Sequence, residues 1–171
     1  SLTPTFDSLQ GGETLALSGT GSVSTANVGS SKAVSLGSIA LAAGSGNPSN
    51  YSLNSATMSV TQRVINLDGI RAYDATTNVF SSDINTFGNI VSGETLTISG
   101  TGSVGTNSVA MNKAITIGSL SLGNGSGLAS NYTLTGGTHT FDISPVSVNV
   151  TGSRQYLSLI HISEPTRRPI I

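Results

Sequence analysis

The chain has 171 residues, no cysteine and a formal net charge of −1, and charged residues make up only 9% of it. A chain of this length holds one domain or two small ones, and the lack of cysteine excludes disulfide staples and metal sites built on thiolates. The charge balance offers little attraction for nucleic acid, and no apolar run approaches the about 20 residues of a membrane helix.

The N-terminal stretch SLTPTFDSLQ has neither an initiating Met nor a basic region, which predicts a fragment of a longer protein. Shortly after it, GETLALSGTGSV (residues 12–23) begins a repeat that returns as GETLTISGTGSV (93–104). This register, which pairs Gly12 with Gly93, holds without a gap as far as SNYSL (49–53) and SNYTL (130–134), and more than half of the aligned positions are identical. The chain therefore contains an internal duplication.

Apolar and polar residues alternate along several short segments of both copies. This period of two, with many β-branched residues, indicates strands with one buried face. In chain order the clearest apolar sets are Leu96 and Ile98; Ile115 and Ile117; Leu120 and Leu122; Phe141 and Ile143; and Val146, Val148 and Val150. The phase slips by one across Gly118, which predicts a bulge or a strand that changes sheets.

Turn sequences such as SGTGS, GSGNPSN, GNGSG and TGGT separate these segments, and no window shows a helical apolar stripe with caps. We predict an all-β fold of tandem small antiparallel β-sandwich-like units, with six or seven short strands each, in an extended array. The sheet order stays open between an immunoglobulin-like and a β-grasp-like arrangement, because short strands of similar pattern fit both.

A second alignment marks where the units begin. LDGIRAYDATT (67–77) aligns with VTGSRQY (150–156), and the matched pairs are Gly69 with Gly152, Arg71 with Arg154, and Tyr73 with Tyr156. The expected division is a partial repeat over residues 1–66, a complete repeat over 67–149 and the start of a third repeat over 150–156.

Residues 157–171 do not continue the third repeat. Asp is expected next, and the chain instead reads LSLIHISEPTR (157–167), which resembles a translated sequencing adapter over its whole length. We expect a non-native tail without functional weight, and the alternative is a short basic peptide for a membrane or a partner.

The run GIRAYDATT (69–77), followed by GETLTISGTGSV, KAITIGSLSL and NYTL, resembles the YDG repeat of large bacterial surface proteins, including filamentous-haemagglutinin-type adhesins. The resemblance covers residues 67–149 as one full YDG-like unit and residues 1–66 as the later part of another. Ala75 stands where the family name expects Gly, which argues against a requirement for positive φ there. The structural signature residues that we expect are Gly69, Arg71, Tyr73, Asp74 and Tyr132.

Structural roles are expected for the signature side chains. Tyr73 is expected to bury its ring under the sheet junction and to hydrogen-bond through its hydroxyl, and Asp74 to accept backbone N–H groups in an Asx-turn. The alternative for Tyr73, and equally for Tyr51 and Tyr132, is contact with a sugar. An aromatic residue that occurs once per repeat is more often a core anchor.

No catalytic, cofactor-binding or metal-binding residue is predicted. His139 corresponds to Met58 in the other repeat, which favours a packing or rim position over a base or ligand. Glu13 and Glu94 recur once per unit without the second carboxylate that glycoside hydrolysis needs. GNGSG (123–127) lacks the Lys and the helix of a phosphate loop.

Calcium at a unit junction is the alternative that the sequence leaves open. Asp68 and Asp142 both lie near unit ends, but calcium needs six to eight oxygen ligands and no known calcium loop is present.

The prediction is therefore a structural or adhesive segment of a secreted or surface-anchored bacterial adhesin, which acts as a stalk or spacer and is not an enzyme. A glycan-binding β-sandwich module is the alternative. The expected partners are neighbouring repeats of the same chain, with host or matrix glycans or proteins bound through other regions. Nucleic acid, membrane insertion and cofactors are not expected, and the expected location is the bacterial cell surface.

Overall fold

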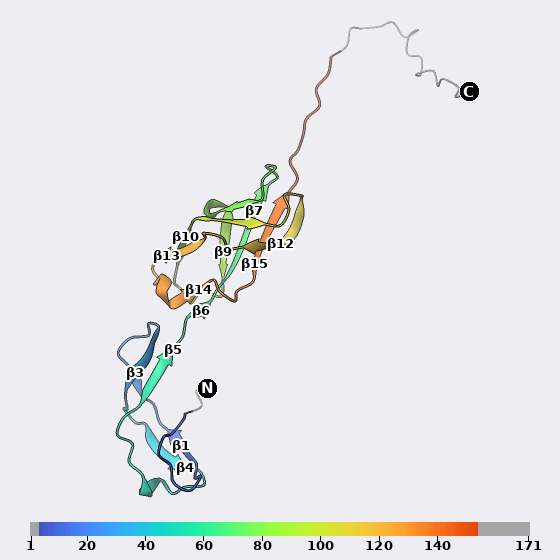
Figure 1. Cartoon of the computed structure of the whole chain (residues 1–171). Helices are drawn as coiled ribbons and strands as arrows, with labels where there is room; N and C mark the ends of the chain where they lie inside the picture. The colour runs from blue at the N-terminus through green and yellow to red at the C-terminus, as the bar shows by residue number, and fades with distance from the viewer. Residues whose placement is uncertain (1–3, 154–171) are drawn as a thin grey trace, which may run out of the picture.

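The computed structural model describes residues 4–153, whose ordered elements are short β-strands and three single-turn 3-10 helices (Figure 1). These residues contain no α-helix, so the predicted all-β class is confirmed. None of the helical turns in the described part of the chain is long and apolar enough to cross a membrane. The strands form two units that follow one another, the first unit over residues 4–60 and the second unit over residues 66–144 (Figure 1).

The duplicated sequence folds twice in a similar way. The first unit contains β1 (Leu15–Ser18), β2 (Ser22–Val23), β3 (Gly29–Ser35), β4 (Ala40–Ala43), η1 (Pro48–Asn50) and β5 (Thr57–Val60), and β6 (Arg63–Val64) follows it. The second unit contains β7 (Asn66–Ala72), β8 (Asn78–Phe80), η2 (Ser81–Asp83), β9 (Ile84–Gly88), β10 (Leu96–Ser99), β11 (Thr101–Val104), β12 (Ala110–Thr116), β13 (Ser121–Asn124), η3 (Ala129–Asn131), β14 (Tyr132–Thr133) and β15 (His139–Ser144). In the alignment of the two repeats, β1, β3, β4 and η1 coincide with β10, β12, β13 and η3.

Each unit contains an antiparallel ribbon that bends sharply halfway along its length. In the second unit β10 pairs with β13, β11 pairs with β12, and the bend falls at Gly100 and Gly118, whose φ angles are 91° and 58°. A Cβ on Gly100 would lie 2.2 Å from the carbonyl oxygen of Ser119, so only glycine fits. The two halves of the ribbon belong to different sheets, and the predicted phase slip at Gly118 therefore marks a change of sheet. Gly19 and Gly37 form the same bend in the first unit.

The main sheet of the second unit has the strand order β8-β11-β12-β15-β7-β9. The strands of this sheet that come first and last along the chain, β7 and β15, are neighbours and run parallel. Leu67 lies opposite His139 and Ala72 opposite Ser144. The prediction of six or seven antiparallel strands is thus wrong in detail, since the described second unit has nine strands and a parallel pair. Parallel neighbours require a long crossover, so local alternation carries no information about them.

The core is well covered in the second unit and open in the first. Val34, Ile39 and Val60 of the first unit are partly exposed, and among its described residues Leu15 alone is a buried apolar side chain. In the second unit β7, β8 and β9 cover the equivalent positions, and the described part of the first unit has no counterpart of them. The buried core cluster consists of Ile65, Leu67, Val79, Ile84, Leu96, Val104, Ile115, Leu120, Tyr132, Phe141 and Ile143.

Candidate functional site

The signature turn after β7 is organised around the guanidinium group of Arg71. Its Nη2 atom donates to the carbonyl oxygen of Thr76 at 2.6 Å and lies 3.0 Å from Oδ1 of Asp74, and its Nη1 atom donates to the carbonyl oxygen of Asn78. The side chain is only 9% exposed, and its Cζ atom lies 5.5 Å from the ring centroid of Phe141. Arg71 therefore closes the turn by satisfying its carbonyl groups, which is a structural role.

Asp74 forms the Asx-turn that its sequence context suggests. Its Oδ1 atom accepts hydrogen bonds from the backbone N–H of Thr76 at 2.9 Å and from the Thr76 hydroxyl at 3.0 Å. The backbone N–H of Thr76, with smaller contributions from the Thr76 hydroxyl and from Arg71, lowers the pKa of Asp74 below its usual value.

The expectation for Ala75 is wrong. Its φ angle is 66°, in the left-handed region that favours glycine. The inference from residue type failed because the Arg71 and Asp74 contacts fix the turn on both sides of Ala75 and hold it in this conformation.

The expected burial of Tyr73 is also wrong, since its side chain is 42% exposed and its hydroxyl has no hydrogen-bond partner among residues 4–153. Strand β7 ends at Ala72, one residue before Tyr73, so the ring lies beyond the edge of the core. Its backbone N–H still donates to the carbonyl oxygen of Ser144 at 2.9 Å and extends the contact between β7 and β15. Gly69, by contrast, is buried, and a Cβ there would lie 2.7 Å from the carbonyl oxygen of Asp83.

Each unit also contains a tyrosine–glutamate pair that the sequence reasoning missed. The hydroxyl of Tyr132 donates to Oε2 of Glu94 at 2.5 Å, and Tyr51 makes the equivalent bond to Glu13 at 2.5 Å. Burial and the bond to Glu94 raise the pKa of Tyr132, while the bond to Glu13 is the main cause that raises the pKa of Tyr51. The recurrence of both residues in the two repeats was the available signal, and it indicates a structural bond.

His139 is buried, and both of its ring nitrogens are used within the fold. Its Nδ1 atom accepts a hydrogen bond from the backbone N–H of Leu67 at 3.1 Å, and its Nε2 atom lies 2.9 Å from the carbonyl oxygen of Leu134. The ring therefore joins β15 to β7 and to the loop that precedes β15, and neither nitrogen is free to act on a substrate.

The two aspartates of the calcium alternative each have a hydrogen-bond partner within the second unit. Oδ1 of Asp68 accepts from the hydroxyl of Thr140 at 2.8 Å, and Oδ1 of Asp142 accepts from the backbone N–H of Asn112 at 2.7 Å. Within residues 4–153 no group of three or more His, Cys, Asp or Glu side chains is placed to hold a metal ion.

The segment that connects the two units binds along the second unit. Its strand β6 pairs in parallel with β14, and Nε2 of Gln62 donates to the carbonyl oxygens of Ser130 at 3.2 Å and Tyr132 at 3.1 Å. Nε of Arg63 donates to the carbonyl oxygen of Asn89 at 2.6 Å, and Ile65 is fully buried. These contacts order the connection between the units.

A second contact crosses directly from one unit to the other at Asn131, the last residue of η3. Its Oδ1 atom accepts from the backbone N–H of Val28 at 2.9 Å, and its Nδ2 atom donates to Oδ1 of Asn27 at 3.0 Å. One side chain of the second unit thus binds a loop of the first unit through both of its polar atoms.

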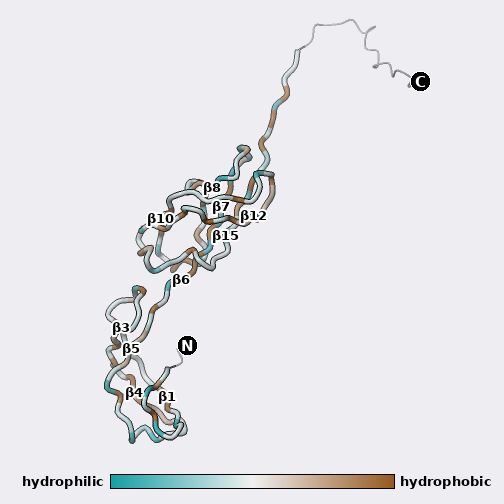
Figure 2. Tube along the Cα trace, viewed as in Figure 1, coloured by the Kyte–Doolittle hydropathy of each residue, from teal (hydrophilic) through white to brown (hydrophobic). Residues whose placement is uncertain are grey.

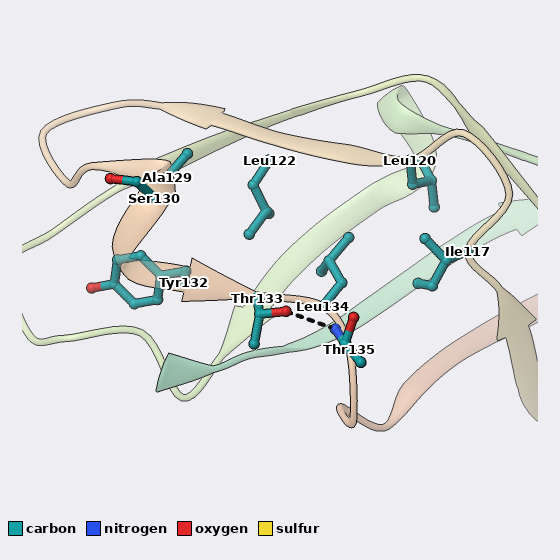
Figure 3. A pocket seen from close by; sticks show the side chains of 9 residues that line it. All are labelled: Ile117, Leu120, Leu122, Ala129, Ser130, Tyr132, Thr133, Leu134 and Thr135. Atoms are coloured by element: carbon teal, nitrogen blue, oxygen red, sulfur yellow. Dashed lines mark hydrogen bonds between the residues drawn. The ribbon is translucent and has the colours of Figure 1, made fainter. Parts of the chain in front are cut away.

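An open groove of about 450 Å³ lies on the second unit (Figure 3). Leu122 and Leu134 point into it, and Tyr132 lines one end with its ring directed away from these leucines. Beside the groove, Thr133 Oγ1 accepts from the backbone N–H of Thr135 at 3.1 Å. None of its lining residues is charged, so the groove offers no carboxylate, imidazole or ammonium group.

Comparison with known proteins agrees with these features. The model of the YDG domain matches residues 1–59 and again residues 61–140, which together are most of the chain. The chain therefore belongs to the YDG domain family. No curated protein and no solved structure matches the chain at a significant level.

Proposed function

We propose that this chain is a structural spacer: consecutive YDG units that are held end to end and add length to a larger surface protein. The observation that carries this proposal is the ordered junction, in which Asn131 binds Asn27 and Val28 while Gln62 binds the second unit. A mobile linker would leave the units free to reorient, whereas this one is hydrogen-bonded along its length.

The setting that we propose is the stalk of a secreted or surface-anchored bacterial adhesin of the filamentous-haemagglutinin type. The YDG resemblance supports this setting, and the weakly charged, hydroxyl-rich composition suits a rod that faces the medium. The absence of catalysis belongs to the same proposal. It is supported by the use of His139, Asp74 and Glu94 in hydrogen bonds within the fold.

Small-angle X-ray scattering on the chain tests the spacer proposal. We expect an elongated particle with two maxima in its pair-distance distribution, because the units lie one after the other (Figure 1). A single compact maximum, with the units folded against each other, would contradict the proposal.

A glycan-binding module is the second candidate, and the exposed ring of Tyr73 is the observation that favours it. Sugar-binding sites commonly use exposed aromatic rings, while Tyr132 is buried and thus does not contribute such a surface. A glycan array on the chain and on Tyr73→Ala separates the two candidates. Binding that disappears in the variant would support the module, and equal signals from both proteins would exclude this ring as a sugar site.

A further inference from the structure

The loop of the first unit that Asn131 binds is closed by a lysine side chain. This loop, here called the junction loop, comprises residues 24–28 and lies at the end of the first unit nearest to β6 and the second unit (Figure 2). The Nζ atom of Lys32 donates to the carbonyl oxygen and the hydroxyl of Thr25 at 2.6 and 2.9 Å, and to the carbonyl oxygen of Asn27 at 2.6 Å. An ammonium group has three N–H donors, so all three are used within the junction loop.

Lys32 and Asn131 bind the two ends of one peptide group. The peptide bond between Asn27 and Val28 presents its carbonyl oxygen to the Lys32 ammonium group, and its N–H donates to Oδ1 of Asn131 at 2.9 Å. A peptide group is planar, so the direction of its carbonyl bond fixes the direction of its N–H. A charged donor on the carbonyl oxygen also polarises the group and strengthens the hydrogen bond that its N–H makes. The contact of Lys32 therefore acts directly on the contact between the units.

A β-bulge directs Lys32 toward the junction loop. The register of β3 with β5 shifts between Gly29 and Lys32, and Ser31 within this bulge has a φ angle of 51°. A bulge changes the direction of the side chains beside it, and here it brings the Lys32 ammonium group back to residues 25 and 27 of the same unit.

The second unit repeats this arrangement at a loop outside the junction between the two units. Lys113 corresponds to Lys32 and follows the same register shift in β12. Its Nζ atom donates to the hydroxyl of Thr106 at 2.9 Å and to the carbonyl oxygen of Ser108 at 3.2 Å. The chain thus contains a matched control, because Lys113 closes a loop of its own unit in the same way without acting on Asn131.

We propose that Lys32 is a positioning residue for the junction: its ammonium group holds the peptide group between Asn27 and Val28 in the orientation that Asn131 binds, and it thereby stiffens the angle between the units. This inference rests on the proposed spacer function and assigns part of the stiffness to a side chain that bonds only within its own unit. Without the ammonium group the junction loop loses the three bonds that close it, and the N–H of Val28 turns away from Asn131 more often.

Amide hydrogen exchange on the whole chain, followed by NMR spectroscopy, tests this role at the N–H of Val28. Lys32→Met keeps most of the side-chain length and removes the charge, and we expect the Val28 amide to exchange about fivefold to tenfold faster. The N–H of Val34, which donates to the carbonyl oxygen of Ala56 at 2.9 Å within the first unit, is expected to keep its exchange rate. Lys113→Met is the matched control and is expected to leave the exchange of Val28 unchanged.

Chemical restoration of the ammonium group gives an independent measurement. The chain has no native cysteine, so Lys32→Cys can be alkylated with bromoethylamine to a side chain that again ends in an ammonium group. We expect slow exchange at Val28 to return after this alkylation. Fast exchange that persists with the restored ammonium group would overturn the proposal.

Two further outcomes of Lys32→Met would overturn it. Unchanged exchange at Val28 would show that Lys32 does not place this peptide group. Equal acceleration at Val28 and Val34 would show that Lys32 stabilises the first unit as a whole. The scattering test of the spacer uses the unchanged chain, so a single compact maximum there contradicts the spacer, whereas two maxima with unchanged Val28 exchange contradict only the role of Lys32.

Discussion

Ala75 is the residue whose backbone is least suited to its side chain in the signature turn. At a φ of 66° an alanine costs about 1 kcal/mol relative to glycine, since its Cβ approaches the following carbonyl group. We expect Ala75→Gly to raise the free energy of unfolding by roughly 0.5–1 kcal/mol, measured by urea denaturation followed by circular dichroism.

The matched control for this change is Ala72→Gly at the end of β7. There the backbone is extended, so the same substitution adds only conformational freedom to the unfolded chain and is expected to destabilise by about 0.5–1 kcal/mol. Equal effects of the two changes would mean that the turn does not strain Ala75.

The hydroxyl of Tyr132 gives the second unit a dependence on alkaline pH. Its pKa is raised in the folded protein, so the folded state holds its proton more tightly than the unfolded state does. Stability from this bond is complete below the ordinary pKa of 10.0 and falls as the pH rises from there toward the folded pKa. We expect the melting temperature to decrease above about pH 10 and Tyr132→Phe to weaken that decrease. An unchanged slope in the variant would contradict this assignment.

At the scale of elements, the bent ribbon requires glycine at residue 100 for two reasons, a positive φ angle and the lack of room for a Cβ. The two reasons can be measured separately. Gly100 and Gly93 have similar φ angles of 91° and 84°, but a Cβ would collide with Ser119 at Gly100 and meet nothing within 4 Å at Gly93. Gly100→Ala is expected to cost at least about 3 kcal/mol and Gly93→Ala about 1 kcal/mol in urea denaturation. Similar losses would show that backbone angle alone, and not the close crossing of the ribbon, requires Gly100.

The bend also shows how far the sequence predicts this fold. The slip in alternation at Gly118 predicts a bulge or a change of sheet, because side-chain direction reverses with every residue of a strand, and the structure shows the change of sheet. The parallel pairing of β7 with β15 lacks such a signal, since it joins the first and last strands of the unit.

The contacts of the site residues likewise fall into those that the sequence predicts and those that it does not. Asp74 lies two residues from its partner Thr76, so residue types alone suggest the Asx-turn. Tyr132 and Glu94 are 38 residues apart, and only the folded chain brings them together. Tyr73 shares the inward parity of Leu67 and is exposed because alternation does not say where the core ends.

At the scale of the whole molecule, the duplication provides a matched residue against which the junction contact of Asn131 can be compared. Asn131 corresponds to Asn50 in the first unit, and both end a 3-10 helix. Asn131 binds Asn27 and Val28 across the junction. Asn50 is exposed, and its helical turn η1 lies at the end of the first unit that faces away from the second unit (Figure 1).

Removal of the Asn131 amide should therefore loosen the angle between the units without unfolding either of them. The Asn131→Ala change leaves the N–H of Val28 and the side chain of Asn27 to water, which is accessible at this partly exposed site, so the stability loss is about 1 kcal/mol or less. We expect the two maxima in the scattering pair-distance distribution to broaden and the largest dimension to vary more. Asn50→Ala is expected to leave the distribution unchanged. Identical curves for both variants would mean that β6 and Gln62 alone fix the angle, and a spacer would then owe its stiffness to the connecting strand.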